Sequence, residues 1–404
     1  MSSLGAVLLL CIVDAALGCS TVHVTSPTGE TVIGRTMELG GAGGEMHANY
    51  RGMLVRMQSG VPSLPWEVAA HRRGETVGEG MQVLCGSQTS GAWSVKYGYV
   101  SVDLAIPESN ITSLASDGIN EMGLTVSEHT LRQSQYMAPN MSVPSNSQLQ
   151  VCWVAITTWL LGNIDSVATF RSMLSELRIL APSVPVPDGD LLHWSIDDKN
   201  GEHIVIEVLD GQIQVHDNTV GTFTNDPDFR WHLRNLNNYV NLRSDWPNGG
   251  DGIQVQTEVG AVPQVVGHGF NLLGLPGDFS PPGRFVRLFY QRSYAMLKYP
   301  PASLNGSIAL VSGLLNSVMI SHGTLSDAPG TAAQPEFTQY TVIKLSSSRH
   351  FYYKDYVNTQ WRLVRLSELD FSPRSRTVTA VQSAIPLVDG TLGVEDMTGA
   401  FAAV

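Results

Sequence analysis

A cysteine, Cys19, lies shortly after a short apolar segment near the start of this chain of 404 residues. The apolar run covers residues 4–13 and is too short for a membrane span, which needs about 20 residues. Ala16 and Gly18 then provide the small residues of a secretory cleavage site. We therefore predict a signal peptide over residues 1–18 and one domain over residues 19–404; the alternative is a buried N-terminal helix or strand. After cleavage, Cys19 would be the first residue of this domain. Its free amine and its thiol would then lie on the same residue, and the fold must accommodate both groups.

Three Asn-x-Ser/Thr sequons agree with export of the chain, and they begin at Asn110, Asn140 and Asn305. We expect a secreted, periplasmic or lysosome-like luminal protein, with glycans on these asparagines if the cell is eukaryotic. In a bacterium, residues 17–19 partly match a lipoprotein cleavage box, and acylation of Cys19 would block its chemistry. No later segment reaches about 18 uninterrupted apolar residues, so we expect no transmembrane anchor.

The charge balance argues against one large class of partner. The chain has 24 Lys and Arg residues against 36 Asp and Glu residues, a formal net charge of −12. Such a surface repels phosphate backbones, so nucleic acid is not an expected partner. His71, His193 and His203 lack metal-ligand spacing, and the glycine-rich segments lack a phosphate-binding strand–loop–helix context. We therefore predict no metal and no other cofactor.

The cysteine count singles out Cys19 in a second way. Cys11 leaves with the signal peptide, so the mature chain keeps an odd number of cysteines. An odd number in an oxidising compartment leaves one thiol free or paired with another molecule. One interpretation joins Cys85 to Cys152 and leaves Cys19 free. The other is that all three are reduced thiols, two of them simply buried.

Alternating and helical hydrophobic patterns predict both strands and helices. Strands at 19–24 and 31–35 flank a turn at 26–29 and predict an opening hairpin. Further strands are predicted at 97–105, 191–196, 202–209, 212–216, 338–345 and 350–353, and helices at 151–161, 166–179 and 285–296, the last with Ser280 as N-cap. Residues 40–91 are predicted to be loops with short strands. This order predicts an α+β domain of packed antiparallel sheets covered by helices.

A cysteine at a mature N-terminus carries its own base. The α-amine has an ordinary pKa of about 7.7–8.0, so part of it is neutral near physiological pH and can take the thiol proton. Position alone does not distinguish this role of Cys19 from an accident of cleavage or from a disulfide. The motifs elsewhere in the chain bear on that choice.

Six motifs give the chain a resemblance to a known family. They read CSTVHV (19–24), GRTME (34–38), DGINEMGL (117–124), TNDP (224–227), LPGDFSPPGRFVR (275–287) and TQYT (338–341). In this order they resemble the choloylglycine hydrolase family of linear-amide C–N hydrolases, which includes bile salt hydrolases and penicillin V acylases. The resemblance spans nearly all of the mature chain. It implies an N-terminal nucleophile hydrolase fold of four layers, αββα, with two stacked antiparallel sheets.

The resemblance also implies roles for single residues. Cys19 matches the nucleophile, and Arg35 matches an arginine near it whose buried charge would favour the thiolate. Asn225 matches the side-chain donor of the oxyanion hole. Arg284 matches the arginine of the family's S-R-F segment, although Gly283 replaces the serine.

Three further positions match less closely. Glu38 stands where bile salt hydrolases have an aspartate that contacts the N-terminal amine, so the carboxylate is kept and one methylene is added. Thr130 is the nearest residue by counting to a second oxyanion position, which is usually Asn or Tyr. Asn120 lies in the motif just before it and is a further oxyanion or substrate candidate.

These matches predict a cysteine-dependent hydrolase of non-peptide amides, of the penicillin V acylase or bile salt hydrolase type. Its expected partner is a small-molecule amide with an apolar acyl group. Long-chain N-acyl amides and acyl homoserine lactones are alternative substrates. A different class stays open, a secreted or lipid-anchored binding protein that has the same fold and no activity. The sequence also leaves a homo-oligomer open.

Overall fold

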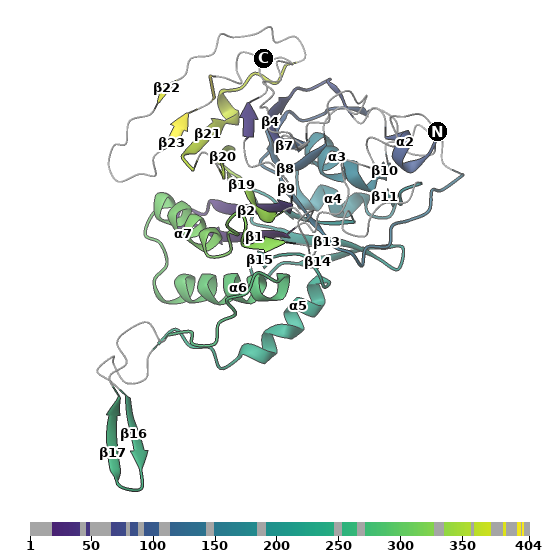
Figure 1. Ribbon diagram of the computed structural model, residues 1–404. Helices are drawn as coiled ribbons and strands as arrows, with labels where there is room; N and C mark the ends of the chain where they lie inside the picture. Colours follow the sequence, from purple (N-terminus) through teal and green to yellow (C-terminus); the bar gives the residue numbers. More distant parts are fainter. Residues whose placement is uncertain are drawn as a thin grey trace.

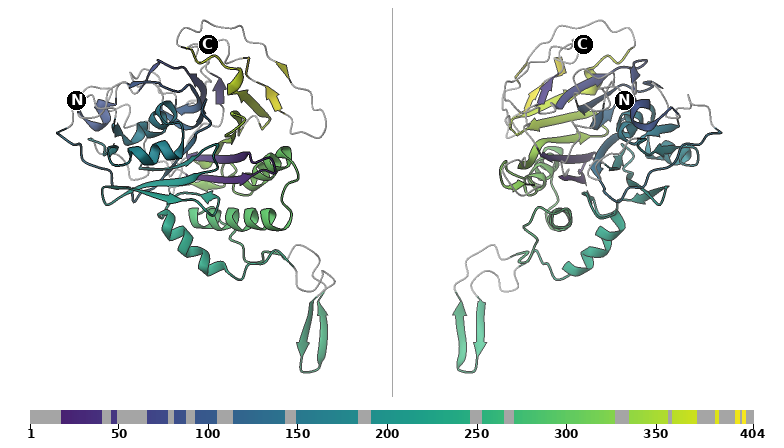
Figure 2. Two further views of the ribbon diagram at one scale, coloured as in Figure 1. Left: turned by 180° about the vertical axis from the view of Figure 1, so that it is seen from behind. Right: turned by 45° about the vertical axis from the view of Figure 1, so that its right-hand side comes forward.

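The computed structural model describes residues 18–40, 46–48, 66–77, 81–87, 93–104, 114–142, 149–183, 191–245, 253–264, 271–326, 335–356, 359–372, 383–384, 394–396 and 398–399. Figures 1 and 2 show two β-sheets in the body of the molecule, with helices on their outer sides. The predicted signal peptide as far as Leu17 and the sequon at Asn110 lie outside the described residues.

The predicted opening hairpin is confirmed and lies near one edge of the first sheet. β1 (Gly18–Thr25) pairs antiparallel with β2 (Thr31–Gly40), and Cys19 lies opposite Met37. Gly29 in the connecting turn has a φ of 82°, a left-handed conformation that glycine adopts without strain. β2 extends beyond the predicted end of its strand, so the GRTME motif lies wholly within the sheet.

Among the described residues, nine strands form this first sheet, in the order β15-β1-β2-β19-β20-β21-β23-β22 with β18 paired to β19. The strands not yet placed are β15 (Thr222–Phe223), β18 (Leu325–Ser326), β19 (Pro335–Leu345), β20 (His350–Asp355), β21 (Trp361–Arg365), β22 (Ser383–Ala384) and β23 (Val394–Asp396). The two late strands predicted from the sequence are confirmed as β19 and β20.

The second sheet has eight strands within the described ranges, in the order β14-β13-β12-β9-β8-β7-β4-β3. Their bounds are β3 (Met46–Ala48), β4 (Trp66–His71), β7 (Tyr99–Leu104), β8 (Ala115–Asn120), β9 (Thr125–Thr130), β12 (Leu192–Asp197), β13 (His203–Leu209) and β14 (Gln212–Asp217). The predicted meander is confirmed as β12 to β14, because tight turns join neighbouring antiparallel strands. β3 and β4 lie within residues 40–91, where loops with short strands were predicted.

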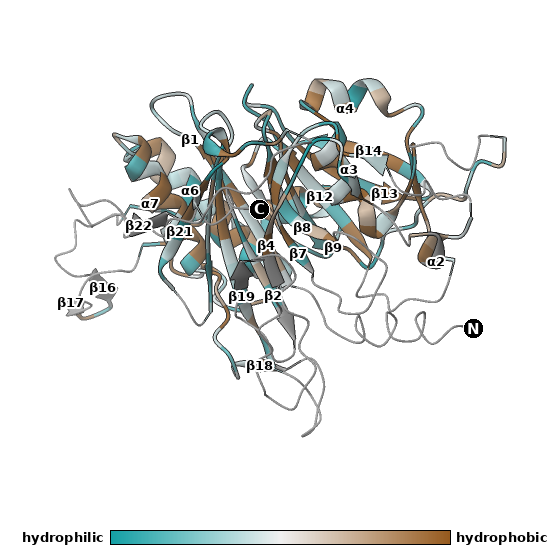
Figure 3. Ribbon diagram, turned by 90° about the horizontal axis from the view of Figure 1, so that it is seen from above, coloured by the Kyte–Doolittle hydropathy of each residue, from teal (hydrophilic) through white to brown (hydrophobic). Residues whose placement is uncertain are grey.

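Helices cover the outer faces of both sheets. α3 (Ile156–Asn163) and α4 (Val167–Met173) pack on the second sheet, whereas α6 (Pro281–Lys298) and α7 (Leu304–Asn316) pack on the first (Figure 1). Figure 3 colours the hydrophobic residues of these helices and of the strands brown. The α+β prediction and its αββα layering are therefore confirmed. The predicted N-cap Ser280 accepts a hydrogen bond from a backbone N–H of the first turn of α6.

Two predicted helix boundaries are wrong. Strand β10 (Gln150–Cys152) occupies the start of the first predicted helix, so α3 begins only at Ile156. Strand β11 (Arg178–Leu180) occupies the end of the second predicted helix, and α4 ends at Met173. Continuous apolar runs suit a buried strand as well as a buried helix, so the hydrophobic pattern alone could not place these boundaries.

The remaining described elements are short. They are β5 (Thr76–Val77), α2 (Gln82–Cys85), β6 (Trp93–Ser94), η1 (Trp153–Ala155), α5 (Phe229–Asn235), η3 (Leu236–Tyr239), β16 (Ile253–Thr257), β17 (Gly260–Gln264) and η4 (Leu366–Glu368). The β16–β17 hairpin extends away from the body in Figures 1 and 2. In the part of the chain that the structure describes, no helix combines the length and hydropathy of a membrane span.

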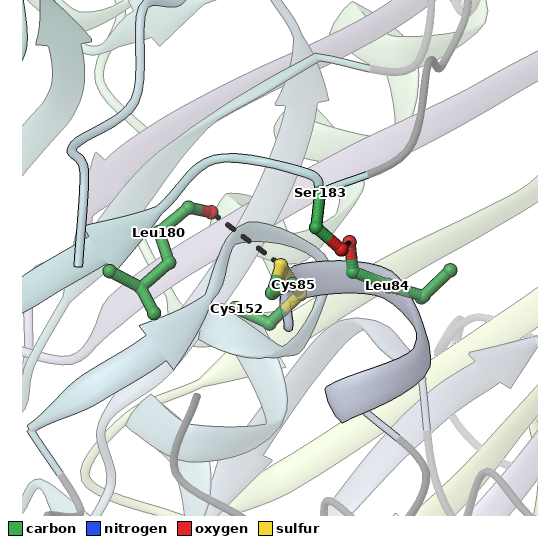
Figure 4. Close-up of a disulfide and its surroundings, with 5 residues drawn as sticks. All are labelled: Leu84, Cys85, Cys152, Leu180 and Ser183. Carbon is green, nitrogen blue, oxygen red and sulfur yellow. Dashed lines mark hydrogen bonds between the residues drawn. A yellow bond between two sulfur atoms is a disulfide. The ribbon is translucent and has the colours of Figure 1, made fainter. Parts of the chain in front are cut away.

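A disulfide joins Cys85 at the end of α2 to Cys152 in β10 (Figure 4). This pairing is the first of the two interpretations of the cysteine count. Ser183 lies beside the disulfide and donates a hydrogen bond to the carbonyl of Leu84 (Figure 4). Cys19 is a free, buried thiol.

Candidate active site

Cys19 lies in the space between the two sheets. Its side chain is 1% exposed and packs among apolar residues from both sheets, including Met37 and Val102. The sulfur lies 3.5 Å from Met37 Sδ and accepts a hydrogen bond from Arg35 Nη2 at 3.3 Å. Cys19 and Arg35 lie on neighbouring strands of one hairpin, so the opening sequence of the chain is sufficient to bring this pair together.

Arg35 is fully buried and holds contacts with both sheets. Nη2 donates to the carbonyl of Glu128 at 2.7 Å, and Nη1 donates to the hydroxyl of Tyr340. Nε lies 3.7 Å from a carboxylate oxygen of Asp117, whose other oxygen lies 2.7 Å from Lys344 Nζ. The sequence prediction named Arg35 but missed these partners. Asp117 and Tyr340 belong to motifs of the resemblance, which is the one signal that could have pointed to them.

Burial decides the protonation of the thiol. Desolvation raises the pKa of Cys19 to about 11, although Arg35 acts in the opposite direction. The cation therefore favours the thiolate, as expected, but burial outweighs its effect in the chain with a peptide bond before Cys19. A base that takes the proton is needed at neutral pH.

Asn225 is the second residue after β15 and contacts the nitrogen of Cys19. Asn225 Oδ1 accepts hydrogen bonds from the Cys19 N–H at 2.6 Å and from Arg284 Nη2 at 2.8 Å. Its Nδ2 donates to Thr130 Oγ1 at 2.9 Å. Because both neighbours of Oδ1 are donors, the orientation of the amide is defined by its contacts. The oxygen of Asn225 therefore faces Cys19, and its N–H groups, expected at the oxyanion, face Thr130 at the end of β9.

Arg284 joins the same cluster from the first turn of α6. Its Nη1 donates to the carbonyl of Cys19 at 2.6 Å and to Ser20 Oγ at 2.7 Å. The guanidinium is 1% exposed, so these contacts are made away from bulk water. Arg284 thus fixes the main chain of Cys19 and the side chain of Asn225 relative to each other.

Glu38 and Asn120 have other contacts than those expected. Glu38 is buried opposite Gly18, and its Oε1 accepts a hydrogen bond from Thr338 Oγ1 at 2.7 Å. Burial raises the pKa of Glu38. Asn120 donates to the carbonyls of Leu161 and Ile164. Its Oδ1 accepts from two backbone N–H groups of the β8–β9 turn. Asn120 therefore holds this turn against α3 and is not part of the Cys19 cluster.

Within the described residues, one group of three side chains has donor atoms close enough to hold a metal: His23, Asp197 and His203. His203 shows no ligand spacing in the sequence, because His23 and Asp197 come from other strands. Both Nδ1 atoms contact the same Asp197 oxygen, at 3.3 Å for His23 and 2.7 Å for His203. Two ligands of one tetrahedral zinc ion lie about 3.3 Å apart for bonds near 2 Å. The shorter contact is that of a direct hydrogen bond, so the group is a hydrogen-bonded carboxylate.

A four-layer αββα sandwich with a buried cysteine on its first strand defines the class of N-terminal nucleophile hydrolase folds. Residues 77–379 match the family model of linear amide C–N hydrolases, choloylglycine hydrolase family. This match covers more than half of the chain, and the protein belongs to that family.

Curated relatives and solved structures agree with this assignment. The chain is 32% identical over 214 residues to a bile salt hydrolase/transferase of Clostridium perfringens. The aligned residues cover 52% of this chain and 60% of the relative. It is 24% identical over 306 residues to a penicillin V acylase of Pectobacterium atrosepticum, and the aligned residues cover 71% of each of the two chains. The match to the bile salt hydrolases thus spans less than two thirds of their length.

Two solved structures share the fold over most of the chain. A variant of the conjugated bile acid hydrolase from Clostridium perfringens superposes with a TM-score of 0.66 at 22% identity, over 87% of this chain and 94% of that one. A penicillin V acylase from Agrobacterium tumefaciens gives a TM-score of 0.59 at 17% identity, over 96% and 97%. At these identities the superpositions establish the fold alone.

Proposed function

We propose that this protein hydrolyses the C–N bond of non-peptide carboxamides, with Cys19 as nucleophile once the chain has been cleaved behind Gly18. One observation carries the proposal. The sulfur and the nitrogen of Cys19 are each contacted by a separate buried polar group, at 3.3 Å by Arg35 and at 2.6 Å by Asn225 Oδ1. Such a site suits a residue whose thiol and amine both take part in the reaction.

Cleavage turns the peptide nitrogen of Cys19 into an α-amine. The neutral amine takes the thiol proton, and the sulfur attacks the amide carbonyl carbon. Asn225 Oδ1 orients the amine, and Arg35 stabilises the thiolate. A substrate carbonyl near Thr130 would receive an N–H of Asn225 as its oxygen becomes negative, together with a backbone N–H. The leaving amine takes the proton from the α-amine, and water then hydrolyses the thioester.

The relatives support the proposal of an acylase whose amide substrate carries an apolar acyl group. Their names refer to bile salts, conjugated bile acids and penicillin V. Glu38 in place of the aspartate and Thr130 in place of Asn or Tyr favour a general acylase over a bile salt specialist. We further propose that the protein works in an exported or luminal compartment, since the Cys85–Cys152 disulfide suits an oxidising environment. Asn140 and Asn305 are then candidate glycosylation sites.

A chain whose first residue is Cys19 is expected to hydrolyse members of a panel of phenoxyacetyl, bile acid and long-chain fatty amides. A chain that retains Gly18 should be at least about 100-fold slower, because a peptide nitrogen cannot accept the thiol proton. Release of the amine gives the rates, and mass spectrometry verifies the first residue of each preparation. Equal rates from the two chains would contradict the role of the amine.

The chain that retains Gly18 also allows the thiol itself to be titrated. Its pKa is raised to about 11 by burial, so the thiol should be protonated at neutral pH and form thiolate only in strongly alkaline solution. The ultraviolet absorbance of the thiolate, measured against a Cys19→Ser blank, gives the midpoint. Replacing Arg35 by Met should move the midpoint higher still, because the guanidinium lowers this pKa. A midpoint at or below the ordinary cysteine value of about 8.5 would refute the desolvation argument.

A further inference from the structure

Two buried histidines hold the main chain that carries Asn225. His193 Nε2 lies 3.0 Å from the carbonyl oxygen of Thr224, and His232 Nε2 lies 2.8 Å from the carbonyl oxygen of Asn225. Both imidazoles are at most 1% exposed. The chain leaves β15 after Phe223, so these two carbonyls lie outside the sheet ladder and need donors from elsewhere. The histidines supply them at consecutive residues.

The contact with Asn225 defines which nitrogen of His232 carries the proton. Burial lowers the pKa of His232 to about 4, so the ring is neutral at pH 7, and the proton is on Nε2 because that atom faces a carbonyl. The ring stacks on Phe285 with centroids 4.5 Å apart, which fixes its plane. Neither histidine was among the site residues predicted from the sequence.

His193 is held by a carboxylate on its other side. Its Nδ1 lies 3.1 Å from Glu207 Oε1, and this oxygen also accepts the N–H of Phe229 at 2.9 Å. Burial alone would raise the pKa of Glu207, but hydrogen bonds from His193 and His216 bring it to about 2, so the carboxylate is ionised. The two nitrogens of His193 thus contact Glu207 Oε1 on one side and the Thr224 carbonyl on the other. Glu207 thus fixes His193, which in turn holds Thr224.

We propose that His193 and His232 are positioning residues for Asn225. They hold the 224–225 main chain so that the Asn225 amide stays 2.6 Å from the Cys19 nitrogen and keeps its N–H groups toward the oxyanion. The inference rests on the proposed function, in which Asn225 contacts the amine and the reacting carbonyl. Neither histidine touches the Cys19 thiol in the contacts of the described residues, so each acts through the backbone.

A matched pair of substitutions tests the inference. In His232→Gln the side-chain nitrogen can reach the place of Nε2 and donate to the Asn225 carbonyl, whereas in His232→Asn it is too short. We expect His232→Asn to lower kcat about 10- to 100-fold with KM within about threefold, because small displacements of a catalytic group have such costs. His232→Gln should stay within about fivefold of the wild type in kcat. His193→Gln, which also keeps a donor for Thr224, should behave like His232→Gln.

His71→Asn controls for loss of stability alone, since His71 is another buried histidine, bonded to Asp103 at 2.9 Å on the second sheet. It should leave kcat unchanged. Equal kcat in the two His232 variants, or an equal decrease in both and in His71→Asn, would overturn the inference.

Crystal structures of the processed His232 variants give a second measure, the distance from the Cys19 nitrogen to Asn225 Oδ1. It should lengthen in His232→Asn only. A wild type that hydrolyses no amide would refute the proposed function, and this distance would then decide the positioning role by itself.

Discussion

Replacing Cys19 by alanine is expected to lower kcat by at least about 10⁴-fold, because the substitution removes the atom that forms the thioester. The fold should survive. The side chain is small and makes one hydrogen bond with Arg35, so we expect the free energy of unfolding to fall by only about 1 kcal/mol. Hydrolysis of the best amide in the panel, together with denaturant unfolding, measures both quantities.

A Thr21→Ala variant is the matched control for Cys19→Ala. Thr21 lies two residues along the same strand and contacts His129 Nε2 at 2.7 Å, so its loss perturbs the same layer without touching the thiol. It should retain hydrolysis. A Cys19→Ala chain with activity near that of the wild type would eliminate the mechanism. Loss of the folded state in Cys19→Ala would instead show that the thiol is needed for packing.

Removal of the Cys85–Cys152 disulfide is expected to lower the free energy of unfolding by about 4 kcal/mol. The two cysteines are 67 residues apart, and a cross-link over a loop of that length restricts the unfolded chain strongly. The double substitution Cys85→Ala with Cys152→Ala tests this by denaturant unfolding. The disulfide lies on the far side of the second sheet, in the hydrophobic cluster around α3. Catalysis at Cys19 should therefore be affected little at temperatures where the protein stays folded.

Wild-type protein under reducing conditions is the control for the disulfide experiment. It keeps both sulfur atoms and therefore separates the loss of the cross-link from the small cavities that alanine leaves. Both preparations should lose similar stability. A decrease below about 1 kcal/mol in the reduced wild type would contradict the loop-entropy argument.

Local sequence signals were sufficient for the hairpins and for the start of α6. The turn at 26–29, the meander β12–β14 and the N-cap Ser280 depend on a few neighbouring residues, and all three were predicted correctly. The start of the first middle helix and the end of the second were wrong. There the strands β10 and β11 pair with each other, and Cys152 is tied to Cys85, so contacts between distant segments overrode the apolar pattern.

For the candidate site too, the sequence predicted the residues but not their contacts. Cys19, Arg35, Asn225, Thr130 and Arg284 were named from the sequence, and the structure brings them into one cluster, whereas Asn120 holds a turn elsewhere. The atoms that meet were not predictable. Cys19 and Asn225 are 206 residues apart, and only the packing of β15 beside β1 places the amide oxygen on the Cys19 nitrogen.

The sequence by itself predicted a cleavage site before Cys19, the hairpin that carries Cys19 beside Arg35, and the family motifs that accompany it. The tertiary structure decided the protonation of the thiol, the orientation of Asn225, and the two histidines that hold it. The physical reason is that desolvation and hydrogen-bond direction depend on groups from both sheets, which the order of residues along the chain does not place.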